Sequence, residues 1–288
     1  MYRALSMSVL LQRLALCAQS FPADSRAFSE ADDKELIQAV CSGRTESGGK
    51  VACGKYCPQG AGLSQGAGDF DWSLVRVTQG HFLSKTSDDA VIATDGCEPH
   101  SNNYGGSVLL TRKAGEWTML WYRGGVETRQ CHKVQLISAR DILVCMGEYG
   151  AQGNIYKDLY VEDLLEPSGS LMAAKSPGFF SIEDNTINCG FYDRREGWPF
   201  LKYAAIEAVE FRPSAKGAAA GISVTFARAT KKLTSAAGEA CAGGPERAQT
   251  SSKVSSAAHR YQVDFLFDGR NYKATASGAA LIKRLELP

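Results

Sequence analysis

Short apolar runs separated by turn-forming residues occupy most of the chain from Trp72 onward. Runs of this kind, bounded by Gly, Asn, Asp or Ser, are typical of successive β-strands rather than of helices. The sequence therefore predicts an all-β fold, made mainly of antiparallel hairpins and arranged as a sandwich or a propeller. The expected strands are residues 74–78, 90–94, 107–112, 155–161, 205–211 and 222–227.

Residues 107–122 are expected to form a hairpin that turns at residues 113–116. Neither side of this hairpin is cleanly polar, as is expected of a sheet covered on both faces. The predicted cross-strand pairs are Val108 with Trp121 and Leu110 with Met119. In this register Trp117, Met119 and Trp121 would share one face.

The strongest hairpin signal lies near the C-terminus, where residues 261–267 alternate before an Asp-Gly pair at 268–269. Such a pair favours a type I′ turn, because both central residues must adopt positive φ. That turn would set Phe265 opposite Tyr272. A further hairpin is expected over residues 134–146, with Ile137 opposite Ile142.

A short helix is expected near the N-terminus, where Ser29 precedes acidic residues in a pattern that resembles a capping box. Residues 43–68 follow it and are rich in Gly, Ser and Gln, so regular structure is not expected there unless cysteines staple the segment. The residues that recur on one face of the helix, and should pack, are Leu36, Ile37, Val40 and Cys41.

Composition also suggests where the chain divides. Residues 166–178 contain two prolines and two glycines, which break strands and suit a connection between two sheets or domains. Residues 234–258 have few large apolar side chains, so a mobile loop is expected. The predicted parts are a signal peptide at 1–27, a short helix and Gly/Cys-rich loop at 28–70, a β-rich domain at 71–166 and a second β-rich region at 178–288.

The first residues resemble a secretory signal, since Arg3 precedes an apolar stretch and residues 25–27 offer a small-x-small cleavage site. An amphipathic N-terminal helix is the alternative, because a Gln-Arg pair at 12–13 interrupts the apolar stretch. No other segment approaches the roughly 18 apolar residues that a membrane-spanning helix needs. The sequence thus predicts a periplasmic or secreted protein with no membrane span in its mature chain.

Cysteine usage favours the same compartment. Removal of Cys17 with the signal would leave an even number of cysteines, and an oxidising compartment pairs such thiols into disulfides. The connectivity stays open, because eight cysteines allow about 105 pairings. The disulfide candidates are Cys41, Cys53, Cys57, Cys97, Cys131, Cys145, Cys189 and Cys241.

The balance of charge limits the classes of partner. The chain has 32 Lys and Arg against 31 Asp and Glu, a formal charge of +1. Binding to nucleic acid depends on a strong positive field, so nucleic acid is not expected as a partner. An extracytoplasmic protein or a glycan is the partner predicted for an exported chain of this composition.

One segment resembles a known repeat. Gly80, His81 and Phe82 are followed by an Asp-Asp-apolar run at 88–92 and by the strand 117–122. This pattern resembles one unit of the FG-GAP/VCBS type of β-propeller repeat, over residues 78–125. The resemblance implies a role in adhesion or ligand binding. Residues 83–87 lack the alternating Asp and Gly of the family's calcium turn, so it carries no calcium site over to this chain.

Potential metal ligands are densest at Cys97, His100, Cys131 and His132, and two Cys with two His can bind zinc tetrahedrally. The alternative is that Cys97 and Cys131 form a disulfide, with both histidines on exposed loops.

No cofactor is predicted. An acidic, polar stretch before Trp198 is expected to be a solvated loop, with a cation or carbohydrate site as the alternative; it contains Glu183, Asp184, Asn185 and Asp193. General-base candidates are His81, His100, His132 and His259.

No nucleophile elbow, zinc-protease helix, P-loop or dinucleotide turn occurs in the sequence. We therefore predict an exported, non-catalytic β-rich protein that binds another molecule or serves the cell envelope. One alternative is a secreted hydrolase that uses His100 or His132. The other is a divalent-cation module around Asp88 and Asp89, which would have to supply oxygen ligands.

Overall fold

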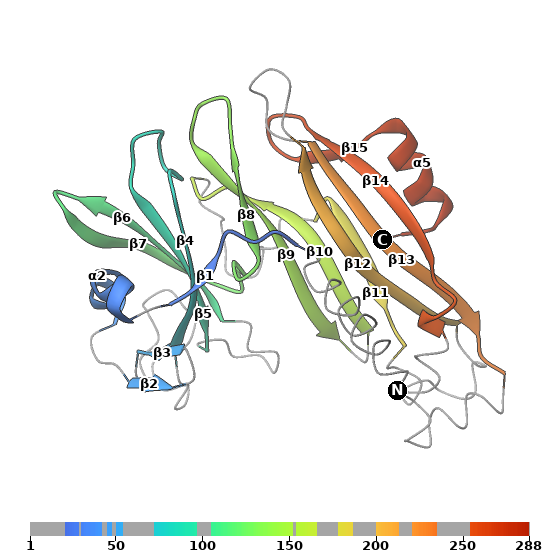
Figure 1. The fold of residues 1–288 in the computed structure, drawn as a ribbon, viewed down its shortest axis with the longest axis horizontal. Coiled ribbons are helices and arrows are strands. Elements are labelled where there is room, and N and C mark those ends of the chain that lie inside the picture. Colours follow the sequence, from blue (N-terminus) through green and yellow to red (C-terminus); the bar gives the residue numbers. More distant parts are fainter. Residues whose placement is uncertain are drawn as a thin grey trace, which may run out of the picture.

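The computed structural model consists mainly of antiparallel β-sheets with two helices among the described residues (Figure 1). The predicted all-β class with a short N-terminal helix is therefore confirmed. The structure describes residues 21–28, 30–41, 45–47, 50–53, 72–96, 105–151, 154–165, 178–186, 200–212, 221–234 and 254–287.

The first sheet contains seven strands and lies in the N-terminal half of the described chain. Its order is β2-β3-β4-β5-β6-β7, and β1 pairs with β4 outside this path. The strands are β1 (Arg26–Ala27), β2 (Thr45–Ser47), β3 (Lys50–Ala52), β4 (Ser73–Gly80), β5 (Asp89–Asp95), β6 (Gly106–Lys113) and β7 (Glu116–Gly124).

The helix α2 (Glu30–Val40) packs on one face of this sheet through the predicted apolar side chains. Leu36 and Ile37 are 2% and 1% exposed, and Val40 and Cys41 are partly buried beside them. A disulfide joins Cys41 to Cys53 and closes the segment that contains β2 and β3. This closure explains regular structure within the predicted loop 43–68, of which only residues 45–47 and 50–53 are described.

Two four-stranded sheets follow along the chain. The second sheet has the order β11-β10-β9-β8 and the third has the order β12-β13-β14-β15, followed by the helix α5 (Ala276–Arg284). Their strands are β8 (Cys131–Gln135), β9 (Asp141–Ala151), β10 (Asn154–Glu162), β11 (Phe180–Asp184), β12 (Phe200–Arg212), β13 (Gly221–Lys232), β14 (His259–Phe267) and β15 (Tyr272–Ala274).

The sheets stack in layers, as Figure 1 shows from α2 at one end to α5 at the other. The second sheet is the middle layer, because alternate residues of β9 enter different cores. Ile142 and Val144 join the core shared with the third sheet, whereas Leu143 joins the core shared with the first sheet. A strand buried on both faces reads as a continuous apolar run, which the sequence of β9 illustrates.

Strand pairing continues across the predicted connection at 166–178. β11 lies beyond it and pairs with β10, with Leu159 opposite Phe180. The core between the second and third sheets also draws on both sides of this connection. The described part thus forms a sandwich from β8 to β15, with the first sheet stacked against its outer face.

The hairpin of β6 and β7 contains a bulge that the prediction missed. Leu110 pairs with Met119 as expected, but Val108 pairs with Tyr122 because Leu120 is an extra residue between the two halves of the ladder. The bulge reverses the alternation beyond it. Trp117 therefore packs in the core under α2, while Trp121 packs in the core against the second sheet. The expectation that both tryptophans share one face is wrong.

Two other registers differ from the predictions because their loops are longer. Ile142 lies opposite Val134, and Ile137 is 79% exposed within the loop between β8 and β9. At the C-terminal hairpin, Phe267 pairs with Tyr272 and Phe265 pairs with Ala274. This shift is by an even number of residues, so Phe265 and Tyr272 still face the same core.

An Asx turn accounts for the longer C-terminal loop. The carboxylate of Asp268 accepts hydrogen bonds from the backbone N–H groups of Arg270 and Asn271, at 3.0 and 2.9 Å. Together with Lys273, these donors hold the pKa of Asp268 well below its usual range. A four-residue loop therefore replaces the predicted two-residue turn.

Candidate functional site

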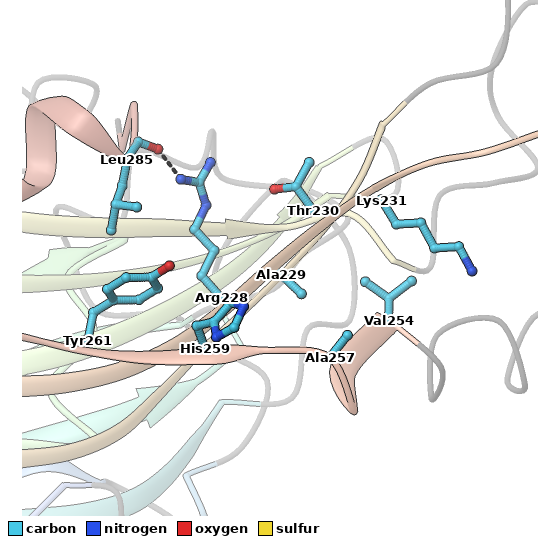
Figure 2. Close-up of a pocket in the computed structure, with 9 residues that line it drawn as sticks. All are labelled: Arg228, Ala229, Thr230, Lys231, Val254, Ala257, His259, Tyr261 and Leu285. Atoms are coloured by element: carbon cyan, nitrogen blue, oxygen red, sulfur yellow. Dashed lines mark hydrogen bonds between the residues drawn. The ribbon is translucent and has the colours of Figure 1, made fainter.

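A cavity of about 520 Å³ opens where β14 begins beside β13 (Figure 2). Its volume falls in the range of about 300–1,000 Å³ that is usual for small-molecule sites. The lining comes from the two strands, from the turn before β14 and from the end of α5. The lining residues are Arg228, Ala229, Thr230, Lys231, Val254, Ala257, His259, Tyr261 and Leu285.

The cavity exists because β13 extends beyond the start of its neighbour. The ladder between β13 and β14 ends at the pair Arg228 and His259. Beyond this pair, residues 229–232 of β13 are paired with β12, and no other described strand covers their opposite edge. The chain before His259 turns away instead of extending the sheet, which leaves a recess at the edge.

This turn is fixed to the sheet by one apolar side chain. Val254 is 1% exposed and packs with Leu201, Ala229 and Leu233 on the face away from the main core. The end of the predicted mobile loop 234–258 is therefore ordered from Val254 onward, and residues 235–253 lie outside the described part. The prediction undervalued a single buried valine in a segment otherwise composed of small and polar residues.

Arg228, His259 and Tyr261 lie on the same face of the third sheet, because Arg228 is opposite His259 and residues 259 and 261 alternate to the same side. The ring of Tyr261 stacks on that of Phe226, with centroids 5.5 Å apart. The Arg228 guanidinium donates to the backbone carbonyl of Leu285, the C-cap of α5 (Figure 2). The negative end of the α5 helix dipole also stabilises the positive charge of this guanidinium.

The ionisable lining residues other than Tyr261 are all basic side chains, namely Arg228, Lys231 and His259. Within the described part, Arg228 has no carboxylate partner, so most of its five N–H donors are available to a ligand. The cavity therefore offers positive charge and hydrogen-bond donors beside apolar surface from Leu285 and Val254. Such a lining can bind and orient a ligand; its described residues include no carboxylate or thiol, and His259 is among the predicted general-base candidates.

The structure places the predicted zinc ligands differently. Cys131 and Cys145 lie opposite each other on β8 and β9 and form a disulfide, and both are fully buried. The alternative bridge between Cys97 and Cys131 is therefore wrong, because the ladder brings Cys145 to Cys131. The Cys131 sulfur is also not available as a zinc thiolate. Cys97 and His100 lie outside the described residues.

His132 contacts the N-terminal segment. Its Nδ1 lies 2.9 Å from the carbonyl oxygen of Pro22 and 3.0 Å from a carboxylate oxygen of Asp24. Its ring lies against Phe211, with centroids 3.9 Å apart. Among described residues, no hydroxyl or thiol hydrogen-bonds the other ring nitrogen, so the contacts position the N-terminal segment.

Asp88 and Asp89 do not converge on a common site. Asp88 is exposed and lies 3.6 Å from the Arg112 guanidinium. Asp89 is buried, and its carboxylate accepts hydrogen bonds from the Leu83 N–H and the Ser87 hydroxyl at 2.9 and 2.5 Å. Asp88 precedes β5 and its carboxylate is exposed, whereas Asp89 begins β5 and its carboxylate is buried, which separates the two. No group of three or more His, Cys, Asp or Glu among the described residues could hold a metal ion.

Within the predicted solvated loop, Glu183 and Asp184 are the last residues of β11, Asn185 follows and contacts β12, and Asp193 lies outside the described residues. Asn185 is buried, and its side chain accepts from the Lys202 N–H at 2.6 Å and donates to the Phe200 carbonyl at 3.1 Å. Glu183 lies 3.1 Å from the Lys202 ammonium.

The disulfide candidates that lie outside the described residues are Cys57, Cys97, Cys189 and Cys241.

Sequence reasoning found His259 as one of four histidines and missed the rest of the cavity. A signal was present on β13, where Ile222, Val224 and Phe226 form an apolar face that Arg228 continues. A charged residue at the end of an apolar face needs a special environment. The recess itself could not be predicted, because it depends on where β14 begins relative to β13.

Comparisons of this chain with protein-family models, with curated proteins and with solved structures found no match. Neither described helix is long and apolar enough to cross a membrane.

Proposed function

We propose that this chain is an exported, non-catalytic binding protein whose ligand occupies the cavity beside the start of β14. The observation that carries the proposal is the recess itself, in which Arg228 presents unused donors beside the stacked ring of Tyr261. A concave site with a few convergent polar groups and an apolar wall is typical of small-molecule sites.

Export is supported by the two disulfides among the described residues, since such bonds persist in oxidising compartments.

The fold gives a reason to move the predicted cleavage site. Phe21 is buried in the main core, and Arg26 and Ala27 form β1, so a cut after Ala27 would remove packed residues. Ala18 and Ser20 offer another small-x-small site that would leave Phe21 as the new N-terminus.

The binding role can be tested with a variant that fills the cavity. Ala257 lines it and is exposed, so Ala257→Phe should obstruct the recess without disturbing the core. A fragment library would be screened by ligand-observed NMR against protein purified from an export-competent host. We expect some fragments to bind the wild type and to lose binding to Ala257→Phe. Ala279→Phe, on an exposed position of α5, is the matched control.

The proposal fails if no fragment binds, or if every fragment that binds the wild type also binds Ala257→Phe with unchanged affinity. Binding that persists in the filled variant would place the ligand elsewhere on the chain. Circular dichroism and melting curves of both variants would show that each is folded.

A secreted hydrolase is the second candidate, and the contact that favours it is the 3.0 Å approach of His132 Nδ1 to Asp24. An acidic group beside Nδ1 orients an imidazole for general-base work. A hydrolase panel would be run on the wild type and on His132→Ala. Any activity that the variant retains in full argues against this role.

A further inference from the structure

We propose that the cavity beside β14 selects an amphipathic organic anion, with its charged head at Arg228 and its apolar body along Tyr261 and Leu285 (Figure 2). This inference rests on the proposed binding function and adds the chemical class of the ligand. Its basis is the lining, in which the basic side chain of Arg228 lies next to the apolar side chains of Tyr261 and Leu285.

The charged end of the cavity is defined by β13 and by the first residue of β14. Arg228 and Thr230 lie on the same face, and His259 stands opposite Arg228. Arg228 uses one donor group for the Leu285 carbonyl, which also holds the guanidinium in place. A guanidinium that is already oriented loses less entropy when it binds a carboxylate through its remaining N–H groups.

Two basic neighbours outside the cavity have partners of their own. Arg260 follows His259 but points to the opposite face, where its Nε lies 2.6 Å from a carboxylate oxygen of Glu207. Lys232 follows Lys231 and lies over the ring of Phe200, at 5.8 Å from its centroid. Within the described part no carboxylate contacts Arg228 or Lys231, so both contribute positive charge to the lining of the cavity.

The apolar end explains why a simple inorganic anion would not fill the site. The Tyr261 ring is supported by Phe226, and the side chain of Leu285 lies on the same side of Arg228, whereas Ala257 and Val254 lie on its other side (Figure 2). Burial of apolar surface contributes about 25 cal/mol per Å², so a ligand with an aromatic or aliphatic body gains affinity that inorganic phosphate cannot. A metal cation is disfavoured because the charged side chains of the lining are also positive and would repel it.

Three probes separate the contributions of charge and apolar body: 4-phenylbutyrate, its neutral isostere 4-phenylbutanamide and inorganic phosphate. Titration calorimetry on the wild type should show the carboxylate binding about tenfold or more tighter than the amide, the size expected for one charge-assisted hydrogen-bonded pair. Phosphate alone should bind more weakly than 4-phenylbutyrate. The preference for the carboxylate should decrease as salt is added.

Two variants distinguish recognition of charge from structural support. Arg228→Gln keeps donors for the Leu285 carbonyl but removes the charge, so it should weaken carboxylate binding about tenfold and leave amide binding unchanged. Equal loss for both probes would mean that the variant disturbs the cavity. Arg228→Lys then provides the second measurement, because it restores charge without the planar fork and should recover part of the selectivity. Arg260→Gln should change neither affinity.

The outcomes separate the inference from the binding role on which it rests. Equal binding of amide and carboxylate, both lost in Ala257→Phe, would overturn the anionic class but keep the binding site. Phosphate binding as tight as that of 4-phenylbutyrate would overturn the amphipathic part. If none of the probes binds, the anionic class is wrong, and the fragment screen with Ala257→Phe decides the binding role alone.

Discussion

Burial in the fold changes the ionisation of Glu162. It lies near the end of β10, where burial raises its pKa to about 7, although the nearby Arg123 guanidinium lowers the pKa and Asp163 raises it. An oxygen of Glu162 lies 3.5 Å from the guanidinium of Arg123, which in turn lies over the ring of Trp121. The carboxylate thus sits between the first and second sheets, where its charge is costly.

We predict that the free energy of unfolding falls between about pH 4.5 and pH 7 because of this residue. The pKa is higher in the folded than in the unfolded protein, so its stabilising contribution is complete below the unfolded pKa and is lost as the pH rises through the folded pKa. Glu162→Gln should remove this pH dependence and be more stable than the wild type at pH 8 by about 2–3 kcal/mol. Urea denaturation at pH 5 and pH 8 would measure it.

Glu148→Gln is the control, because Glu148 is an exposed residue of β9 that pairs with Lys157 at 3.0 Å. It should keep the pH dependence of the wild type. If Glu162→Gln and the wild type show the same change in stability between the two pH values, Glu162 does not ionise as its surroundings indicate.

At the scale of the element, the sequence analysis did not predict the helix α5, although the residues at its two ends are typical of helix caps. Thr275 is its N-cap and accepts a hydrogen bond from the Gly278 N–H at 3.2 Å, while Lys283 and Arg284 lie in its last turn. Gly278 allows close packing, since a Cβ there would lie 2.9 Å from Val263 Cγ1. These signals are local, and the β-rich pattern of the preceding chain obscured them.

We predict that Thr275→Ala destabilises the protein by about 1 kcal/mol, because the first turn of α5 loses its side-chain cap. The loss should appear in urea denaturation and as faster amide exchange in α5. Ser277→Ala changes a neighbouring exposed hydroxyl and serves as control. A Thr275→Ala variant as stable as Ser277→Ala would show that the cap contributes nothing.

The whole molecule is tied together by its N-terminal segment, which contacts all three sheets. β1 pairs with β4 of the first sheet, and the Asp24 N–H donates to the Cys131 carbonyl of the second sheet at 2.8 Å. The ring of Phe21 meets Phe211 of the third sheet edge to face, with centroids 6.0 Å apart. A segment that spans every layer couples their stability.

We predict that the exported protein begins at Phe21 and that a chain beginning at Phe28 is less stable. Phe21→Ala alone should lower the free energy of unfolding by about 3 kcal/mol, as for other buried aromatic residues. Intact mass after export locates the cut, and urea denaturation compares chains that begin at residues 21 and 28. Recovery of a stable protein that begins at Phe28 would show that the segment is dispensable.

The sequence by itself determined the class of fold, because alternation and turn residues act locally. It predicted most strands of the sandwich although not β11, and it predicted the apolar face of α2 and the hairpin pair of Leu110 with Met119. Cysteine usage likewise predicted disulfides, and two are present among the described residues. Each of these follows from side-chain periodicity or composition within a short segment.

Only the tertiary structure decided register, layering and the cavity. A single extra residue at Leu120 moved Trp121 to the opposite face of the sheet. The loop of the last hairpin has four residues, 268–271, where two were predicted, and this shifted the pairing of β14 with β15 by two residues. The cavity arises because β14 begins at His259, where the chain turns on Val254 instead of continuing the ladder. These features depend on contacts between segments far apart in the sequence, and local periodicity carries no information about which segments meet.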